Sequence, residues 1–268
     1  KLTRLGYNVH MVETDLEFLR NPVGFPTDLA VGSPAILLSD IRHYGSIAYG
    51  TILESAFGTS GVKFRNYSDS SHYKLWSGLF DAAGLGYSLP VAGVSEVGST
   101  MICEKHALGK VHQSCIRGKW GQPCMNCWKC FRKNAIIAAI RGPEVKFDYI
   151  QNIVKSKEVR MKIFDDAPIK HEGVLTYSIA KSGPYGGQTM ELLSDLLRVG
   201  KIPIDWMEKW YSGSDYLIHE SYRSEVVKNL ERILGAMRPE DEESLLNWEN
   251  SNDENRERVL YLLKEILF

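Results

Sequence analysis

Four of the five cysteines of this chain gather in the segment SCIRGKWGQPCMNCWKCFRK. Three have the spacing C-x2-C-x2-C, the fourth lies nine residues upstream, and the set is Cys115, Cys124, Cys127 and Cys130. Thiolates two residues apart can point into one tetrahedron, because a tight turn between them brings both sulfurs to the same point. Zinc takes four such ligands at about 2.3 Å, so the pattern predicts a structural zinc site. A disulfide framework is the competing interpretation, but small secreted domains spread their cysteines along the chain.

Five cations surround these cysteines, and they allow three interpretations. The cations are Arg117, Lys119, Lys129, Arg132 and Lys133. They could offset the negative charge of a four-thiolate zinc centre. They could also hold a phosphate or a carboxylate, because arginine binds oxyanions through two hydrogen bonds. Aromatic residues interleave with them at Trp120, Trp128 and Phe131, which leaves nucleic-acid binding open, although these rings could equally shield the metal.

The composition is that of an ordinary soluble protein with one or two domains, since 44% of the 268 residues are apolar and 24% are charged. A net charge of −1 argues against a protein that coats nucleic acid over its whole surface. No apolar run reaches the length of a membrane span, so no membrane partner is expected. The chain starts at Lys1 without Met or an apolar signal region. Together with cysteines used for metal, this predicts a cytoplasmic protein.

The first half of the chain alternates predicted strands and helices. Strands are predicted at residues 7–14, 46–53 and 87–92, and helices at 34–44, 72–83, 95–108 and 131–141. Strand–helix–strand order predicts the α/β class, with a parallel sheet covered on both faces. In such sheets ligands bind beyond the carboxyl ends of the strands, where this chain has Glu13, Asp15 and Thr51. Ordinary loop residues and helix caps are the alternative interpretation of these positions.

The pattern becomes mainly helical after Pro143. Helices are predicted at 145–157, 188–199, 204–211, 222–236 and 253–267. We therefore expect two parts, an α/β domain over residues 1–142 that includes the zinc site and a mainly helical C-terminal region over 143–268.

The motif order PAILLSDIRHYGSIAYGTILES, then YSLPVAGVSEVGSTMICEKHALGK, then the cysteine segment and a basic helix resembles a known family. It is similar to the PP-loop ATP pyrophosphatase superfamily, in particular to 7-cyano-7-deazaguanine synthases, which carry this cysteine arrangement as their zinc site. The stretch FRNYSDSSHYKLWSGLFDAAGLGYSLP also resembles the ATP-dependent UDP-N-acetylmuramoyl-L-alanyl-L-glutamate epimerases. The resemblance covers residues 5–141 and implies an adenine nucleotide alpha hydrolase-like (PP-loop) domain.

The resemblance implies ATP-dependent activation of a small-molecule or peptide carboxylate. The carboxylate attacks the α-phosphate of ATP, which gives an acyl-adenylate and pyrophosphate. The adenylate then reacts with ammonia, as in a C–N ligase, or loses an α-proton, as in an epimerase. Mg²⁺ and backbone N–H groups would hold the triphosphate. By position, the implied nucleotide- and substrate-binding residues are Glu13, Asp15, Thr51, Glu54, Asn66, Ser68, Arg117 and Arg132.

The chain departs from this family in two places. The signature Ser-Gly-Gly-x-Asp-Ser is missing, and we expect it upstream of Lys1. Ser33-Pro34 stands where the synthases usually carry Arg-Asn, which allows a different substrate. The C-terminal region is expected to add a surface for a protein partner, and a homodimer is expected. The hypothesis from another class is a non-catalytic zinc module that binds nucleic acid or a protein.

Overall fold

The computed structural model describes residues 2–19, 21, 30–106, 109, 111–115, 117–142, 154–164, 169–182, 187–249 and 256–267. Its α-helices are α1 (Ser33–Arg42), α2 (Leu53–Ala56), α3 (Ser71–Ala82), α4 (Glu96–Lys105), α5 (Trp128–Arg141), α7 (Lys157–Phe164), α8 (Glu172–Ser182), α9 (Gly187–Leu196), α10 (Glu220–Leu234), α11 (Pro239–Leu246) and α12 (Arg256–Leu267). Its strands are β1 (Ser46–Ala48) and β2 (Gly86–Ser88). The 3-10 helices are η1 (Leu2–Leu5), η2 (Leu16–Leu19), η3 (Ala30–Gly32), η4 (Tyr67–Asp69), η7 (Asp205–Glu208) and η8 (Ser212–Leu217).

The predicted α/β class with a PP-loop parallel sheet is wrong, because the described residues are mainly helical. They contain one sheet of two short strands, β1 and β2, which pair in parallel with Ile47 opposite Tyr87. Helix α3 lies between the two strands in the chain and packs on β2. One strand–helix–strand unit is therefore present, but the described residues form no larger sheet.

The three predicted strands were lost or shortened for different reasons. Residues 7–14 alternate apolar and polar, but they form no strand, and Val9 and Met11 are exposed, so no apolar face is buried there. The strand predicted over 46–53 ends at Ala48, and the chain turns into α2 at Leu53. The strand over 87–92 ends at Ser88, just before Pro90, whose missing N–H cannot join a sheet.

Most predicted helices are present. Helices α1, α3, α4 and α5 lie where the pattern indicated, although α5 starts three residues earlier than expected, at Trp128. Ser95 caps α4 as predicted, because its hydroxyl accepts the N–H of Gly98 at 2.9 Å. In the C-terminal region α9, α10 and α12 match the predicted helices, and the helix predicted over 204–211 is the shorter 3-10 helix η7. Helices α8 and α11 were not predicted, and α7 meets the helix predicted over 145–157 only at Lys157. Most of the helix predicted over 145–157 lies outside the described residues.

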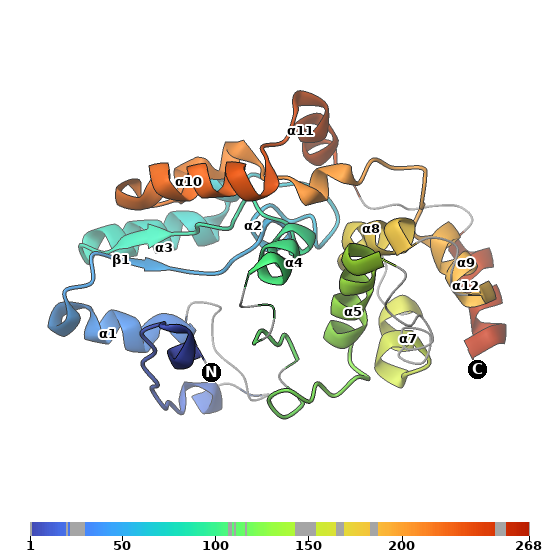
Figure 1. Cartoon of the computed structure of the whole chain (residues 1–268), viewed down its shortest axis with the longest axis horizontal. Helices are drawn as coiled ribbons and strands as arrows, with labels where there is room; N and C mark the ends of the chain where they lie inside the picture. Colours follow the sequence, from blue (N-terminus) through green and yellow to red (C-terminus); the bar gives the residue numbers. More distant parts are fainter. Residues whose placement is uncertain are drawn as a thin grey trace.

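Helix α5 joins two apolar cores. Its Phe131 packs in a cluster that also contains Ile163 of α7 and Leu175 of α8. Its Ile136 faces a second cluster, which includes Trp206 of η7. Figure 1 shows α5 beside α8 and α7, with α3 and α10 at the other end of the view. The first cluster draws on both sides of the boundary predicted after residue 142, and the division into two domains stays a prediction.

None of the helices in the described part of the chain combines the length and the apolarity that crossing a membrane requires.

Candidate metal centre and ligand pocket

The four cysteines of the sequence motif come together. The sulfurs of Cys115, Cys124, Cys127 and Cys130 all lie within 4.8 Å of one another, and three of these residues are buried. Cys124 and Cys130 are 3.8 Å apart at their sulfurs, and all four thiols are free. A tetrahedral centre with Zn–S bonds of about 2.3 Å places its sulfurs roughly 3.8 Å apart, so the spacing fits one metal ion. The cluster could bind a metal ion through a complete set of four sulfur ligands.

Two tight turns bring the sulfurs together. In the first turn the chain at Gly118 packs closely against the backbone at Gln122, so that a Cβ at position 118 would meet the Gln122 carbonyl oxygen at 2.2 Å. Met125 adopts the left-handed conformation, with φ 62°, between Cys124 and Cys127. Cys127 then caps α5, so that the metal loop and the helix start at one point. We use "metal loop" for residues 115–130.

Backbone N–H groups point at two of the sulfurs. The N–H of Cys124 donates to the sulfur of Cys115 at 3.3 Å, and the N–H of Cys130 donates to Cys127 at 3.4 Å. The pKa of Cys115 is lowered to about 6, chiefly because the first of these bonds stabilises the thiolate. Burial raises the pKa of Cys130, so that thiol needs a metal or another cation to ionise near neutral pH.

Glu158 of α7 fastens the metal loop from outside. One of its oxygens pairs with Arg117, and the other accepts the backbone N–H of Trp128 at 3.2 Å. This carboxylate therefore holds both ends of the loop, since Arg117 follows the first cysteine and Trp128 is the first residue of α5.

A buried ion pair extends inward from the metal loop. Arg132 lies two residues after Cys130 and donates from Nε and Nη2 to the two oxygens of Glu96, at 3.1 and 3.2 Å. The side chains of Arg132 and Glu96 are only 9% and 3% exposed. Lys133 lies 3.3 Å from the same carboxylate. Facing Arg132, Glu96 has a pKa below its ordinary value despite its burial.

A second carboxylate lies behind the first. Both oxygens of Glu54 accept the backbone N–H of Glu96 at 2.9 Å, at the start of α4. Burial, followed by the charge of Glu96, raises the pKa of Glu54 to about 7. His171 lies 3.6 Å from Glu96, and burial lowers its pKa to about 4. The metal loop, α5 and the start of α4 are thus connected through buried charges.

A separate pocket of about 320 Å³ opens beside the ends of β1 and β2. Its lining residues are Tyr49, Thr51, Ser55, Ala56, Gly58, Arg65, Asn66, Tyr67, Ser70, His72 and Tyr87. We call it the tyrosine pocket. Arg65 is exposed and has no ion pair in the described part of the chain. It therefore offers a guanidinium to an anionic ligand.

Three polar side chains of this pocket form a hydrogen-bonded row. The hydroxyl of Tyr67 lies 2.9 Å from Nδ1 of His72 and 3.1 Å from the hydroxyl of Tyr87. Burial, followed by the bond to Tyr67, raises the pKa of Tyr87, so its hydroxyl stays protonated at neutral pH. A histidine joined to two tyrosines in an open pocket can take up or deliver a proton.

The structure separates the binding residues predicted from the sequence. Thr51 and Asn66 line the tyrosine pocket, and Ser68 lies nearby in η4, where its N–H donates to Asn66 at 3.4 Å. Glu54 and Arg132 belong instead to the buried ion network. Glu13 and Asp15 are exposed and line none of the described pockets, and Arg117 lines a different pocket. Their binding roles stay predictions.

The residues that sequence reasoning missed come from scattered positions. Glu96 follows the predicted cap Ser95, and a carboxylate at a helix start is so common that it gives no signal. Tyr49 and Tyr87 follow or lie in the two strands, but tyrosines are ordinary strand residues. Of the pocket residues, the sequence had identified Thr51 and Asn66, which the family resemblance assigned to nucleotide and substrate binding.

The family of unknown function DUF6395 matches residues 75–249 of the chain, which is more than half of its length. The match includes the four cysteines and the Arg132–Glu96 pair, while Tyr49, Arg65 and Tyr67 lie before it. No curated protein matches the chain, and no solved structure does.

Proposed function

Since the chain belongs to the DUF6395 family, whose function is unknown, we propose a function from the chemistry of its own residues. It is a zinc-containing enzyme in which the four-cysteine centre is structural and the tyrosine pocket binds and activates a carboxylate. The reaction is attack of the carboxylate oxygen on the α-phosphorus of ATP, which breaks the bond to the leaving pyrophosphate. The identity of the reaction rests on the sequence resemblance, and the location rests on the pocket.

Four sulfurs favour zinc over harder metals such as magnesium, because soft thiolates suit zinc and oxygen ligands suit magnesium. A centre with four protein ligands leaves no open position for water or substrate, which is typical of structural zinc. The sulfurs of Cys115, Cys124, Cys127 and Cys130 would hold the ion. When bound, zinc supplies a fixed point from which α5 and its Arg132 extend.

The observation that carries the choice of the tyrosine pocket is the combination of Arg65 with the row His72, Tyr67 and Tyr87. Arg65 can bind the carboxylate through two hydrogen bonds. The row can hold or pass a proton at the hydroxyl of Tyr67. Two lining residues, Tyr49 and Thr51, follow the carboxyl end of the parallel strand β1, a frequent position for ligands.

Pyrophosphate release tests this proposal. The zinc-loaded chain is incubated with Mg²⁺, ATP and a panel of small and peptide carboxylates, and pyrophosphate and AMP are measured. We expect release with at least one carboxylate, and a loss of at least about tenfold in Arg65→Met. Lys63→Met is the matched control, because Lys63 is an exposed cation that does not line the pocket. No release with any carboxylate, or equal losses in both variants, would contradict the proposal.

A second candidate function is a zinc module that binds nucleic acid. The observation that favours it is the exposure of Trp120, at 56%, next to the exposed Lys119. Aromatic and cationic side chains together are typical of single-strand binding. This function predicts oligonucleotide binding that weakens with salt and with Lys119→Gln plus Lys129→Gln. Binding that is absent or independent of salt would exclude it.

A further inference from the structure

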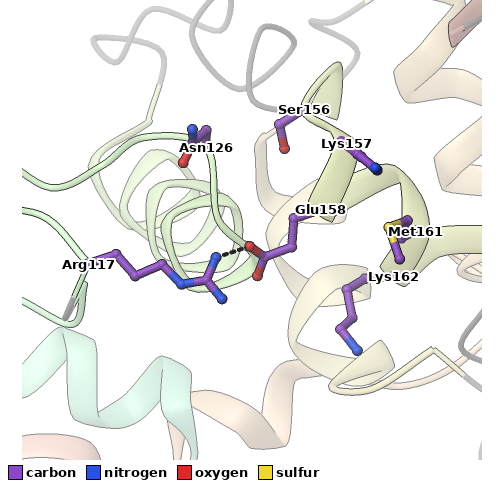
Figure 2. A pocket seen from close by; sticks show the side chains of 7 residues that line it. All are labelled: Arg117, Asn126, Ser156, Lys157, Glu158, Met161 and Lys162. Atoms are coloured by element: carbon purple, nitrogen blue, oxygen red, sulfur yellow. Dashed lines mark hydrogen bonds and ion pairs between the residues drawn. The ribbon is translucent and has the colours of Figure 1, made fainter.

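A second pocket lies between the metal loop and α7, apart from the tyrosine pocket. Its volume is about 440 Å³, and Figure 2 shows Arg117 and Asn126 facing the side chains of α7 across it. The lining residues are Arg117, Asn126, Ser156, Lys157, Glu158, Met161 and Lys162. Two elements distant in sequence therefore form one concave, polar surface.

The charge of this pocket is positive. Three lining residues are cations, Arg117, Lys157 and Lys162, and one is an acid, Glu158. Both oxygens of Glu158 are engaged, one by Arg117 and the other by the N–H of Trp128. The carboxylate is therefore turned toward the metal loop and pairs with Arg117, and Lys157 has no ion pair in the described part of the chain.

Donors for an anion remain around this pocket. The ion pair with Glu158 uses Nη1 of Arg117, which leaves Nε and Nη2 as donors in the described structure. The Ser156 hydroxyl oxygen accepts the N–H of Val159 at 3.3 Å, so its own O–H can still donate. The amide of Asn126 and the ammonium of Lys157 add neutral and charged donors.

We propose that this pocket binds the phosphate group of a small phosphorylated molecule. Phosphate carries more than one negative charge and several acceptor oxygens, which matches the Lys157 ammonium, the remaining N–H donors of Arg117 and the neighbouring hydroxyl and amide donors. The volume exceeds that of a phosphate ion, so it also accommodates the group that carries the phosphate. A nucleic acid would instead call for cations spread along an extended groove.

The competing interpretation assigns these cations to the thiolates of the metal centre. It accounts for Arg117, which lies on the metal loop two residues after Cys115. It does not account for Lys157 and Lys162, which lie on α7 rather than on the metal loop. The site is independent of the reaction proposed for the tyrosine pocket, because the two pockets share no lining residue.

A calorimetric titration of the zinc-loaded full chain with pyrophosphate, and separately with inorganic phosphate, tests the proposal. We expect saturable binding of pyrophosphate that weakens at least about tenfold in Lys157→Gln plus Lys162→Gln, because charge-assisted hydrogen bonds are lost. The matched control is Lys119→Gln plus Lys129→Gln, which removes two cations of the metal loop outside the pocket and should change affinity less than about twofold.

The proposal would be overturned if neither anion bound saturably, or if the control variant lost as much affinity for pyrophosphate as the Lys157 and Lys162 variant. It would also be overturned if a single-stranded oligonucleotide bound more tightly than pyrophosphate and the control variant weakened that binding. A fourth contradicting result would be loss of zinc from the Lys157 and Lys162 variant. The last result would assign these lysines to the metal centre. Zinc content and the unfolding midpoint, measured on every variant, separate a lost binding site from a lost fold.

Discussion

The metal loop and the tyrosine pocket are assembled in opposite ways. The metal loop takes all its candidate ligands from residues 115–130, whereas the pocket collects side chains from the end of β1, from η4, from α3 and from β2. Three of the four cysteines and Arg132 are buried, while Arg65 is exposed. From this difference we infer that the metal loop stabilises the fold and that the pocket is accessible to a ligand.

The largest effect is expected from Cys127→Ser. It removes one of four ligands while serine can still cap α5, so zinc should be lost and the free energy of unfolding should fall by at least about 5 kcal/mol. Zinc content and urea unfolding of the soluble protein measure this, and treatment of the wild type with a chelator provides a second route to the same state. Cys103→Ser is the control, because Cys103 lies outside the cluster and should cost less than about 1 kcal/mol. Similar free energies of unfolding for the two variants would contradict the conclusion that the metal loop stabilises the fold.

The second largest effect is expected from the buried ion pair next to the metal loop, and it tests whether this pair also stabilises the fold. Arg132→Met leaves Glu96 buried without its main partner and should lower the free energy of unfolding by about 3 to 5 kcal/mol. Arg141→Met is the matched control on the same helix, because its pair with Glu104 is partly exposed and worth less than about 1 kcal/mol. If the two variants unfold at the same urea concentration, the buried network does not support the fold.

The pH dependence of stability sharpens the picture of the buried network. Glu54 has a folded pKa of about 7, above its ordinary value, so its contribution to stability declines as the pH rises toward 7. His171 has a folded pKa of about 4, below its ordinary value, so its contribution is lost as the pH falls below about 6.5. The two dependences oppose each other in the wild type.

Glu54→Gln removes one of the two opposing pH dependences of the free energy of unfolding. Between pH 7 and pH 5, the variant should lose about 2 kcal/mol of unfolding free energy on acidification, while the wild type changes little. Urea unfolding at several pH values measures both curves. Parallel curves for the two proteins would show that Glu54 does not titrate in this range.

The smallest effects are expected in the tyrosine pocket. The hydroxyl of Tyr49 is buried without a hydrogen-bond partner in the described structure, so Tyr49→Phe should leave stability unchanged or raise it by up to about 1 kcal/mol. Tyr67→Phe removes the centre of the hydrogen-bonded row and should cost about 1 kcal/mol. Thermal unfolding of the two variants distinguishes them, and a large loss in Tyr49→Phe would mean that this hydroxyl has a partner.

The sequence predicted local features well. The spacing of Cys124, Cys127 and Cys130 anticipated a cluster that forms within one turn and one helix start, because such geometry depends on few residues. The helices α1, α3 and α4 were predicted for the same reason, since their caps and apolar spacing lie within the element. Ser95 is the clearest case.

Features that depend on distant partners were not predictable. Alternation at residues 7–14 resembles a strand, but no core lies beside Val9 and Met11 to bury one face. Glu54 looks like a residue at the end of a strand, yet it contacts the start of α4, forty-two residues further along the chain. Arg132 was predicted to bind nucleotide or substrate, but it pairs with Glu96, which the packing of α4 against α5 brings close to it. Tertiary contacts decided each of these outcomes.

The zinc content and intact mass of the purified chain test the central claim, that residues 115–130 form a closed structural zinc centre. We expect one zinc per chain under native conditions. After denaturation the mass should be that of fully reduced thiols, and Cys127→Ser should retain no zinc. A chain that carries no metal, or whose mass is lowered by the hydrogens that disulfide formation removes, would contradict the claim.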